Sequence, residues 1–365
     1  MISNPKVMKI KILLLTLALF CCRERVNAQY NFNKLDKWLA DNATEMGGRA
    51  ILVIYKDGKM VYNHSVDEMN MRQKMVDRAL AKRQGKTVDL DAYTLTSRQP
   101  IASCSKWLSA ALVMTFVDEG KLKLDDTVGK YLPILSQNGK GKITISQCLS
   151  HMTGINPPPL KEDLAEMKDI NSMDEAIAAI AKMPMEGGPG KVFHYSSAGL
   201  QIAGAILEKI SGKSFEALFL ERIAKPLDMR NTNFGQGKAP VPAGSGQSTP
   251  QDYLNFLVMI MNKGVYNGKR ILSEESIAAM QVNRVTPDVK VTFSPAEAGG
   301  FGYGYGEWTM DGKSSVTSPG LFGSFPWVDS GKKYAAFLMC YYLNNKGRNE
   351  RYIELKKLTD EAVEN

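Results

Sequence analysis

The sequence predicts an α+β protein, an α/β sandwich in which one antiparallel sheet is flanked by helices. Alternating apolar segments separated by glycine turns occur near the start of the chain and again near its end, whereas the middle carries apolar segments of helical length. Strands at both ends must meet in one sheet if each is to bury an apolar face. We therefore expect a sheet built from distant segments, with an all-helical subdomain inserted between them. The length suits one large domain or two intimately packed ones.

The first 28 residues have the composition of a secretory signal peptide. Three lysines precede the apolar run 12–22, and the small residue Ala28 ends the polar stretch after it. We predict cleavage after Ala28, so that the mature domain covers 29–365 and is secreted or periplasmic. Lipidation of Cys21 or Cys22 is one alternative, disfavoured because Phe20 or Cys21 would precede the modified cysteine. An uncleaved anchor is another, disfavoured by the short apolar core.

Loss of this segment changes the charge of the chain. The segment has five basic residues and one acidic residue, so it carries +4 of the net charge of +8. The remaining positive charge is spread along the chain without a basic block, which argues against nucleic acid as a partner. Cys104, Cys148 and Cys340 remain, and their spacing fits neither a disulfide framework nor a metal site. We expect no metal, no cofactor and a fold that depends on a large core.

The predicted sheet subdomain comprises about residues 29–125 and 290–365. Its first half begins with a short helix over 35–43 and a hairpin whose strands, 50–55 and 60–62, flank an Asp-Gly turn. Residues 66–98 are charged and methionine-rich, with helical character but no apolar stripe. We interpret them as a surface insertion, with a flap near the site as one alternative. In the second half, strands are expected over 302–306, 321–328 and 334–343, followed by a helix over 350–363.

The predicted helical subdomain covers about residues 126–289. Helices are expected over 144–151, 172–182, 199–210, 249–261 and after residue 273. Their starts carry capping signals. Ser172 begins a capping box, Thr249 is followed by proline at the first helical position, and Ser273 is a third cap.

The motif with the clearest chemistry is Ser-Cys-Ser-Lys at the start of an apolar segment. Ser103 and Lys106 are three residues apart and share one face of a helix. A serine becomes nucleophilic when a base takes its proton, and a lysine whose pKa is lowered by burial can be that base. Segment 107–117 is apolar on nearly every face and ends before Gly120, which predicts a buried helix too short to span a bilayer. The helix N-terminus favours developing negative charge at Ser103.

This spacing alone is weak support for catalysis. It recurs at Ser330 and Lys333, in a polar glycine turn typical of a hairpin loop. Ser103 could also be a capping residue and Lys106 a side chain that extends to solvent. The three histidines are His64, His151 and His194. Nothing in the sequence joins one of them to a serine and a carboxylate, so lysine and tyrosine are the remaining candidates for the base.

Several separated segments form an ordered set with this motif. They are Ile-Ala-Ser-Cys-Ser-Lys at 101–106, Asp-Glu-Gly-Lys-Leu at 118–122, Leu-Ser-His-Met-Thr-Gly at 149–154, Tyr-Ser-Ser at 195–197, 208–214 and Pro-Leu-Asp-Met at 226–229. In order and spacing the set resembles the serine beta-lactamase-related hydrolases. This family includes class C beta-lactamases, D-alanyl-D-alanine carboxypeptidases, related esterases and D-aminopeptidases. The resemblance covers roughly residues 30–360 apart from the insertion, and it implies a beta-lactamase/transpeptidase-like fold.

The resemblance implies a role for each matched residue. Ser103 would be the acylated nucleophile and Lys106 the base or proton partner beside it. Tyr195 matches the tyrosine that relays a proton between the nucleophile and the leaving group. A phenol serves as a base only when nearby ammonium groups stabilise the phenolate, which Lys106 could do. The backbone N–H groups of Ser103 and of Leu321, on the strand edge after the third family motif, would form the oxyanion hole.

Two positions depart from the family pattern. The family often has Tyr-x-Asn, and here the third position is Ser197. The third motif is usually Lys-Thr-Gly or His-x-Gly, whereas the matching segment here is Ser-Pro-Gly at 318–320. A cation there would bind the carboxylate of beta-lactams and D-Ala-D-Ala peptides. Its absence favours ester or amide substrates without that carboxylate, unless Lys313 replaces it. We expect Ser197, Ser318 and Gly320 at the substrate site.

The sequence therefore predicts an exported serine hydrolase that forms an acyl-enzyme on Ser103, of carboxylesterase or peptidase/amidase type. One alternative is a beta-lactamase or D-Ala-D-Ala carboxypeptidase. Another is a catalytically retired, penicillin-binding-like recognition protein, favoured by the altered second and third motifs. The expected partner is a small-molecule, peptide or ester substrate, with no nucleic acid and no stable membrane span after signal cleavage.

Overall fold

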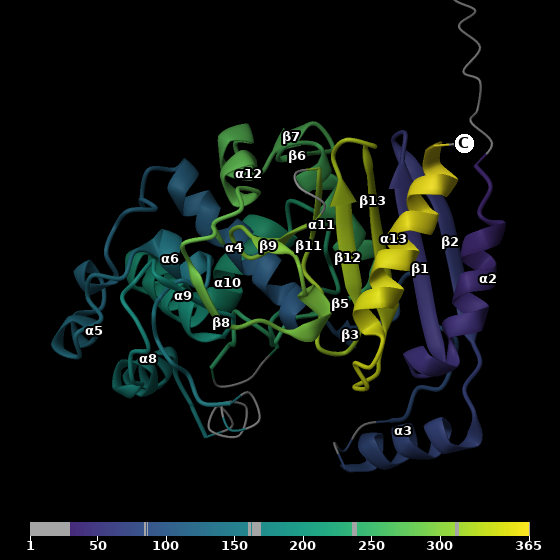
Figure 1. Cartoon of the computed structure of the whole chain (residues 1–365), viewed down its shortest axis with the longest axis horizontal. Helices are drawn as coiled ribbons and strands as arrows, with labels where there is room; N and C mark the ends of the chain where they lie inside the picture. The colour runs from purple at the N-terminus through teal and green to yellow at the C-terminus, as the bar shows by residue number, and fades with distance from the viewer. Residues whose placement is uncertain are drawn as a thin grey trace, which may run out of the picture.

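The apolar segments at the two ends of the chain form one seven-stranded antiparallel sheet, which confirms the predicted α+β class. The computed structural model describes residues 30–83, 85, 87–159, 162, 169–235, 239–310 and 314–364. The strand order in the sheet is β2-β1-β13-β12-β11-β10-β9. The bounds are β1 Arg49–Lys56, β2 Lys59–Asp67, β9 Gly302–Tyr303, β10 Trp308–Met310, β11 Ser315–Thr317, β12 Phe325–Asp329 and β13 Tyr334–Cys340. The helical half lies beside the sheet (Figure 1).

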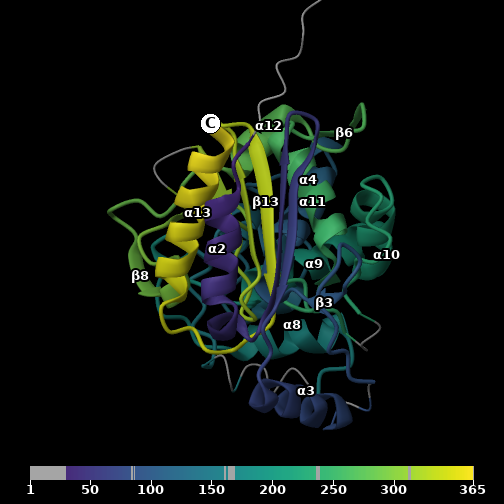
Figure 2. The same cartoon turned by 90° about the vertical axis from the view of Figure 1, so that its right-hand side faces the viewer.

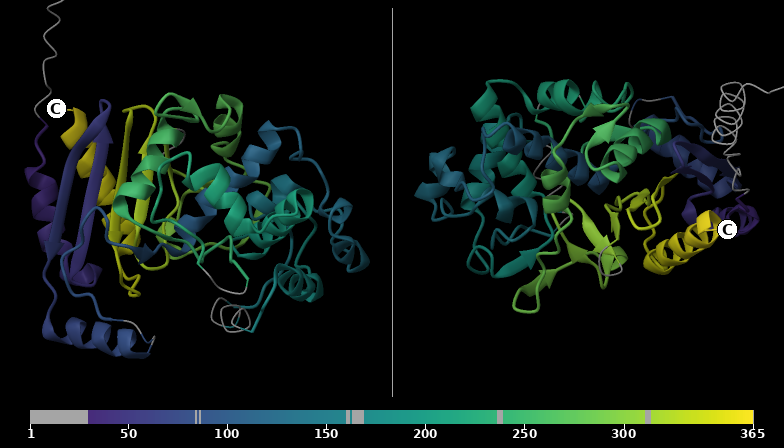
Figure 3. Two further views of the ribbon diagram at one scale, coloured as in Figure 1. Left: turned by 180° about the vertical axis from the view of Figure 1, so that it is seen from behind. Right: turned by 90° about the horizontal axis from the view of Figure 1, so that it is seen from above.

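The two faces of the sheet belong to different cores because side chains alternate along each strand. In β1, Ile51 and Val53 belong to the core shared with the helical half. Leu52 and Ile54 belong to a second core, under α2 (Asn33–Asn42) and α13 (Arg348–Glu364). Both helices run along this outer face (Figure 2). The view from behind in Figure 3 shows the same order, with α2 at one side and the helical half at the other.

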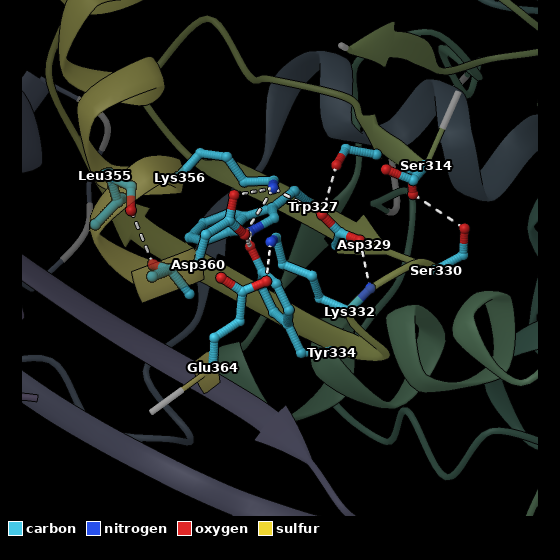
Figure 4. Close-up of polar contacts among 12 residues, drawn as sticks. Ser314, Trp327, Asp329, Ser330, Lys332, Tyr334, Leu355, Lys356, Asp360 and Glu364 are labelled. Carbon is cyan, nitrogen blue, oxygen red and sulfur yellow. Dashed lines mark hydrogen bonds and ion pairs between the residues drawn. The ribbon is translucent and has the colours of Figure 1, made fainter. Parts of the chain in front are cut away.

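A buried ion-pair network fixes α13 to the sheet (Figure 4). The Lys356 Nζ lies 2.8 Å from a carboxylate oxygen of Asp329 in β12 and 2.8 Å from one of Asp360. The Tyr334 hydroxyl donates to Asp360 at 2.7 Å. Burial raises the pKa of Asp329, but hydrogen bonds and charge from Lys356 and its neighbours outweigh burial, so the net pKa is lowered. Asp329 is therefore ionised within the network at neutral pH.

Two apolar helices cover the inner face of the sheet. They are α4 (Ser105–Asp118) and α11 (Pro250–Met261), and nearly all their side chains are buried. In α11, Tyr253 stacks on Phe337 of β13 with ring centroids 4.7 Å apart. The sequence predicts residues 250–261 in the helical subdomain, but α11 also packs on the sheet, and it is buried on nearly every face. The predicted cap is present, since the Thr249 hydroxyl accepts from the Asp252 amide.

Among the described residues, the helical half carries several helices and three two-stranded ribbons. Its helices are α5 Pro133–Gln137, α6 Ile145–Leu149, α8 Met173–Lys182, α9 Ala198–Ser211, α10 Phe215–Phe219 and α12 Glu274–Met280, with single turns η3 Val128–Lys130 and η4 Leu220–Ala224. The ribbons are β3 Gln99–Pro100 with β5 Gln247–Ser248, β4 Val192–His194 with β8 Lys290–Phe293, and β6 Val265–Tyr266 with β7 Lys269–Arg270. Residues 290–293, which the sequence placed with the large sheet, pair instead with the strand that leads to Tyr195.

The charged insertion at 66–98 contains α3 (Met71–Arg83), which lies at the edge of the molecule (Figures 1 and 2). Arg49 of β1 fastens it to the body. The guanidinium lies 3.2 Å from the Asp77 carboxylate, donates to the Asp91 carbonyl at 2.7 Å and covers the Tyr93 ring. The predicted signal segment lies outside the described residues. Within the described part of the chain, every helix is too short or too polar to cross a bilayer.

Candidate active site

A cleft of about 1310 Å³ is lined by segments from both halves of the molecule. Most of its lining residues are apolar. Five of the residues that the sequence assigned to the site line it: Ser103, Lys106, Tyr195, Ser197 and Leu321. Ser318 and Gly320 are not among the lining residues. None of the described residues of the insertion lines the cleft either, so the described part of the insertion is no flap over this site.

Ser103 lies in a single 3-10 turn, η2 (Ala102–Cys104), that leads directly into α4. The preceding residue, Ala102, has a φ of 44°, a left-handed value that costs energy for a residue with a Cβ. Lys106, with only 3% of its surface exposed, lies one helical turn further on. Its Nζ is 3.2 Å from the Ser103 Oγ and 2.8 Å from the Ala243 carbonyl oxygen. The motif therefore places a buried amine beside the hydroxyl, on the wall of the cleft.

Tyr195 lies against the same pair. The Lys106 Nζ is 4.6 Å from the centroid of the Tyr195 ring. Burial raises the pKa of the phenol, and hydrogen bonds with Ser103 and Trp308 only partly offset this effect. Tyr195 is thus protonated at rest at neutral pH. Tyr195 is therefore suited to act first as a proton donor and not as a phenolate base.

His151 supports the segment that carries Tyr195, a role that the sequence did not indicate. Its ring lies 4.6 Å from the Tyr195 ring, and its Nδ1 accepts from the Ser196 amide at 3.4 Å. The Nε2 therefore carries the proton and bonds the Tyr303 hydroxyl at 2.9 Å. Burial, followed by the charge of Lys106, lowers the pKa of His151 well below its usual value. A neutral imidazole is consistent with a positioning role.

Ser318 lies beside the nucleophile, as the third motif predicts, but its side chain points away from the cleft. Only 1% of its surface is exposed, and its hydroxyl lies 3.2 Å from the carbonyl oxygens of Ser103 and Gly306, where it can donate to either. This side chain faces inward and ties the end of β11 to the turn of the nucleophile, so it does not line the cleft. Its predicted contact with substrate stays a prediction. Gly320 packs against the same turn, since a Cβ there would lie 2.5 Å from the Ile101 carbonyl oxygen.

Leu321 lines the cleft from a turn, not from a strand. The predicted strand over 321–328 begins only at Phe325, because residues 320–324 form a turn in which Gly323 has a φ of 93°. The Leu321 carbonyl accepts from the Arg348 guanidinium at 2.9 Å. Among the described residues, none accepts a hydrogen bond from the Leu321 amide. Arg348 is fully buried and also donates to the Tyr342 carbonyl at 3.1 Å, so it holds this turn in place.

The charges around the cleft differ from those expected of a site for anionic substrates. Position 318 has no cation, and Lys313 lies outside the described residues. Besides Lys106, the charged residues that line the cleft are Glu162, Lys182 and Glu297. Lys182 is exposed at the end of α8, and Glu297 lies 3.6 Å from Arg348. Among the described residues that line the cleft, Lys106 is therefore the only buried lysine or arginine, and it belongs to the catalytic cluster. No second buried cation there could bind a substrate carboxylate.

This arrangement agrees with the comparison to known families. The family model described as Beta-lactamase matches residues 39–362. The chain belongs to the beta-lactamase family. Membership confirms the resemblance in the sequence and places the protein among the serine hydrolases of that superfamily.

Three individual proteins that resemble this chain share between 19% and 27% sequence identity with it. An uncharacterized protein of Mycobacterium tuberculosis is 27% identical over 299 residues, which cover 66% of this chain and 74% of the relative. A solved protein from Bacteroides dorei, named as a candidate beta-lactamase, is 26% identical with a TM-score of 0.76 and covers 92% of this chain and 100% of its own. A solved family VIII carboxylesterase is 19% identical with a TM-score of 0.69, covers 90% and 97%, and shares the fold.

Proposed function

We propose that this protein is an exported serine hydrolase that forms an acyl-enzyme on Ser103 and acts on neutral esters or amides. The contact of 3.2 Å between the Lys106 amine and the Ser103 hydroxyl carries the proposal. Lys106 must be neutral when it acts as the base; in that form it can donate one N–H to the Ala243 carbonyl and direct its lone pair at the Ser103 hydroxyl. The family model and the fold shared with a carboxylesterase support the reaction class.

The reaction follows from the positions of three side chains. Lys106 takes the proton of the Ser103 hydroxyl as its oxygen attacks the substrate carbonyl. The N–H groups of Ser103 and Leu321 would stabilise the oxyanion, each contributing about 3 kcal/mol. Tyr195 donates its proton to the leaving oxygen or nitrogen and recovers one from Lys106, which completes the first half. A water molecule then attacks the acyl-enzyme by the reverse sequence of proton transfers and regenerates Ser103.

Active-site labelling tests the nucleophile. The full-length protein, expressed with its export signal, should be labelled by a fluorescent fluorophosphonate, and Ser103→Ala should lose the label. Ser330→Ala is the matched control, because Ser330 has the same spacing to a lysine but lies on an exposed turn. It should be labelled like the wild type. A wild-type protein without label would favour the retired recognition protein, and a labelled Ser103→Ala would place the nucleophile elsewhere.

A comparison of substrates tests the proposed substrate class. Without a cation at position 318, the site lacks a charge-assisted hydrogen bond to a substrate carboxylate, a loss of about 1.5–3 kcal/mol. We expect kcat/KM for neutral short-chain 4-nitrophenyl esters to exceed that for nitrocefin by at least about tenfold. Ser103→Ala should abolish both activities. Equal values for the two classes would contradict the preference and indicate another cation in the cleft.

A further inference from the structure

A second polar cluster lies on the wall of the cleft beside Tyr195. The Nδ1 of His194 is 2.8 Å from a carboxylate oxygen of Glu186. The Thr292 hydroxyl donates to the same carboxylate at 3.0 Å and lies 3.2 Å from the Nδ1. These three residues come from β4, from the loop before it and from β8. The proposed acylation chemistry uses none of them.

The cluster is partly buried, and its exposed side faces the cleft. Both His194 and Thr292 are among its lining residues. The side chains of His194 and Glu186 are only 17% and 16% exposed, and the His194 ring packs beside the Phe293 ring with centroids 5.5 Å apart. The Nε2 of His194 has no hydrogen-bond partner among the described residues, whereas its Nδ1 has two. One ring nitrogen is fixed, and the other is left for a ligand.

Glu186 determines what the open nitrogen can bind. A carboxylate accepts hydrogen bonds only, so it holds the ring proton of His194 on Nδ1. In the neutral ring, Nε2 then carries a lone pair and accepts hydrogen bonds. An ammonium ion would lose much of its hydration in this partly buried cluster, whereas the N–H of a neutral amide loses far less. The group that fits is an amide N–H.

We infer that His194, oriented by Glu186, accepts a hydrogen bond from an amide N–H of the substrate and selects substrates that carry such a group near the scissile bond. The inference rests on the proposed function and narrows its substrate class to amide-bearing esters and peptide-like amides. His194 is the last residue of β4 and directly precedes Tyr195, so the acceptor lies on the same stretch of wall as the proton donor. The amide can belong to the acyl part or to the leaving part, and the test separates these sources.

The experiment compares esters that differ in one N–H. In the acyl arm, 4-nitrophenyl esters of N-acetylglycine and N-acetylsarcosine differ only by methylation of the amide nitrogen. In the alcohol arm, 2-acetamidoethyl butyrate and its N-methyl analogue differ in the same way. The readout is the ratio of kcat/KM within each pair, measured for the wild type, His194→Ala and Glu186→Gln. His64→Ala is the matched control. His64 lies on β2, the edge strand of the large sheet, and its ring is close to the Asp36 carboxylate, as the His194 ring is to that of Glu186.

In one of the two arms, His194→Ala and Glu186→Gln should each lower the ratio of kcat/KM for the N–H ester to kcat/KM for the N-methyl ester. The expected decrease is about 3–10-fold relative to the wild type, which corresponds to the loss of one neutral hydrogen bond. The N-methyl ester itself and the His64→Ala protein should be nearly unaffected. An unchanged ratio in both arms, or an equal loss for both members of each pair, would overturn the inference. If the inference fails but the N-methyl esters are hydrolysed and Ser103 is labelled by the fluorophosphonate, the proposed function still holds. If the wild-type protein is not labelled, the proposed function itself is refuted.

Discussion

Lys106→Ala is expected to lose at least about 100-fold in kcat/KM on neutral esters while the protein stays folded. The expected loss is that of a general base, because no other amine replaces the one at 3.2 Å from the Ser103 hydroxyl among the described residues. Removal of the amine leaves the Ala243 carbonyl unpaired but also ends the cost of burying this polar group, so stability should change little or rise. Ester hydrolysis and thermal unfolding measure the two effects.

The chain offers a matched control for this prediction. Lys140 is also buried, and its Nζ donates to the Ala181 carbonyl at 2.8 Å, but it lies away from the cleft. Burial lowers the pKa of Lys140. Both lysines are buried, and each has its Nζ bonded to a backbone carbonyl oxygen, so Lys140 matches Lys106 in burial and bonding. Lys140→Ala should keep ester turnover near the wild-type value. Near-normal turnover by a folded Lys106→Ala protein would contradict the role assigned to the amine.

The positions of the catalytic groups could be predicted from the sequence, but the directions of some side chains could not. The three side chains of Ser103, Lys106 and Tyr195 meet in one cleft although up to about 90 residues separate them in the sequence. The start of α4 positions Ser103 and Lys106, and the segment before α9 positions Tyr195. Ser318 was placed by its position in the third motif. Its orientation depends on two carbonyl groups, of Ser103 and Gly306, that no sequence pattern brings together.

Contacts between distant segments account for the remaining differences. Leu321 and Phe322 are typical of a strand, but Arg348, 27 residues after Leu321, donates to the Leu321 carbonyl and helps to hold a turn. Similarly, the predicted strand over 302–306 stops at Tyr303, because residues 304–307 turn the chain into β10, with the Gly304 amide donating to the Glu307 carbonyl at 2.9 Å. The pairing of His194 with Glu186 has no periodic signal, since a loop separates them.

Gly320→Ala is expected to lower kcat by up to about 100-fold with a smaller change in KM. A Cβ at this position would lie 2.5 Å from the Ile101 carbonyl oxygen and 3.2 Å from the Cys104 sulfur, so residues on either side of Ser103 block it. A backbone oxygen cannot rotate away, and the turn that carries Leu321 must move relative to Ser103. Shifts of about 1 Å in a catalytic group can cost about 100-fold, because the transition state needs both N–H groups aimed at one oxygen.

The effect should be on the transition state, since the apolar wall that holds the substrate is otherwise intact. Steady-state hydrolysis of a 4-nitrophenyl ester measures kcat and KM, and thermal unfolding shows how much stability the variant keeps. Gly188→Ala is the matched control, because the nearest atom to its new Cβ would be a lysine side-chain carbon at 3.8 Å. A folded Gly320→Ala protein with wild-type kcat would show that the turn at 320–324 does not supply an oxyanion-hole donor. Slow labelling of Ser103 by the fluorophosphonate, with correct folding, would support the assignment, since phosphonylation develops negative charge on the same oxygen position.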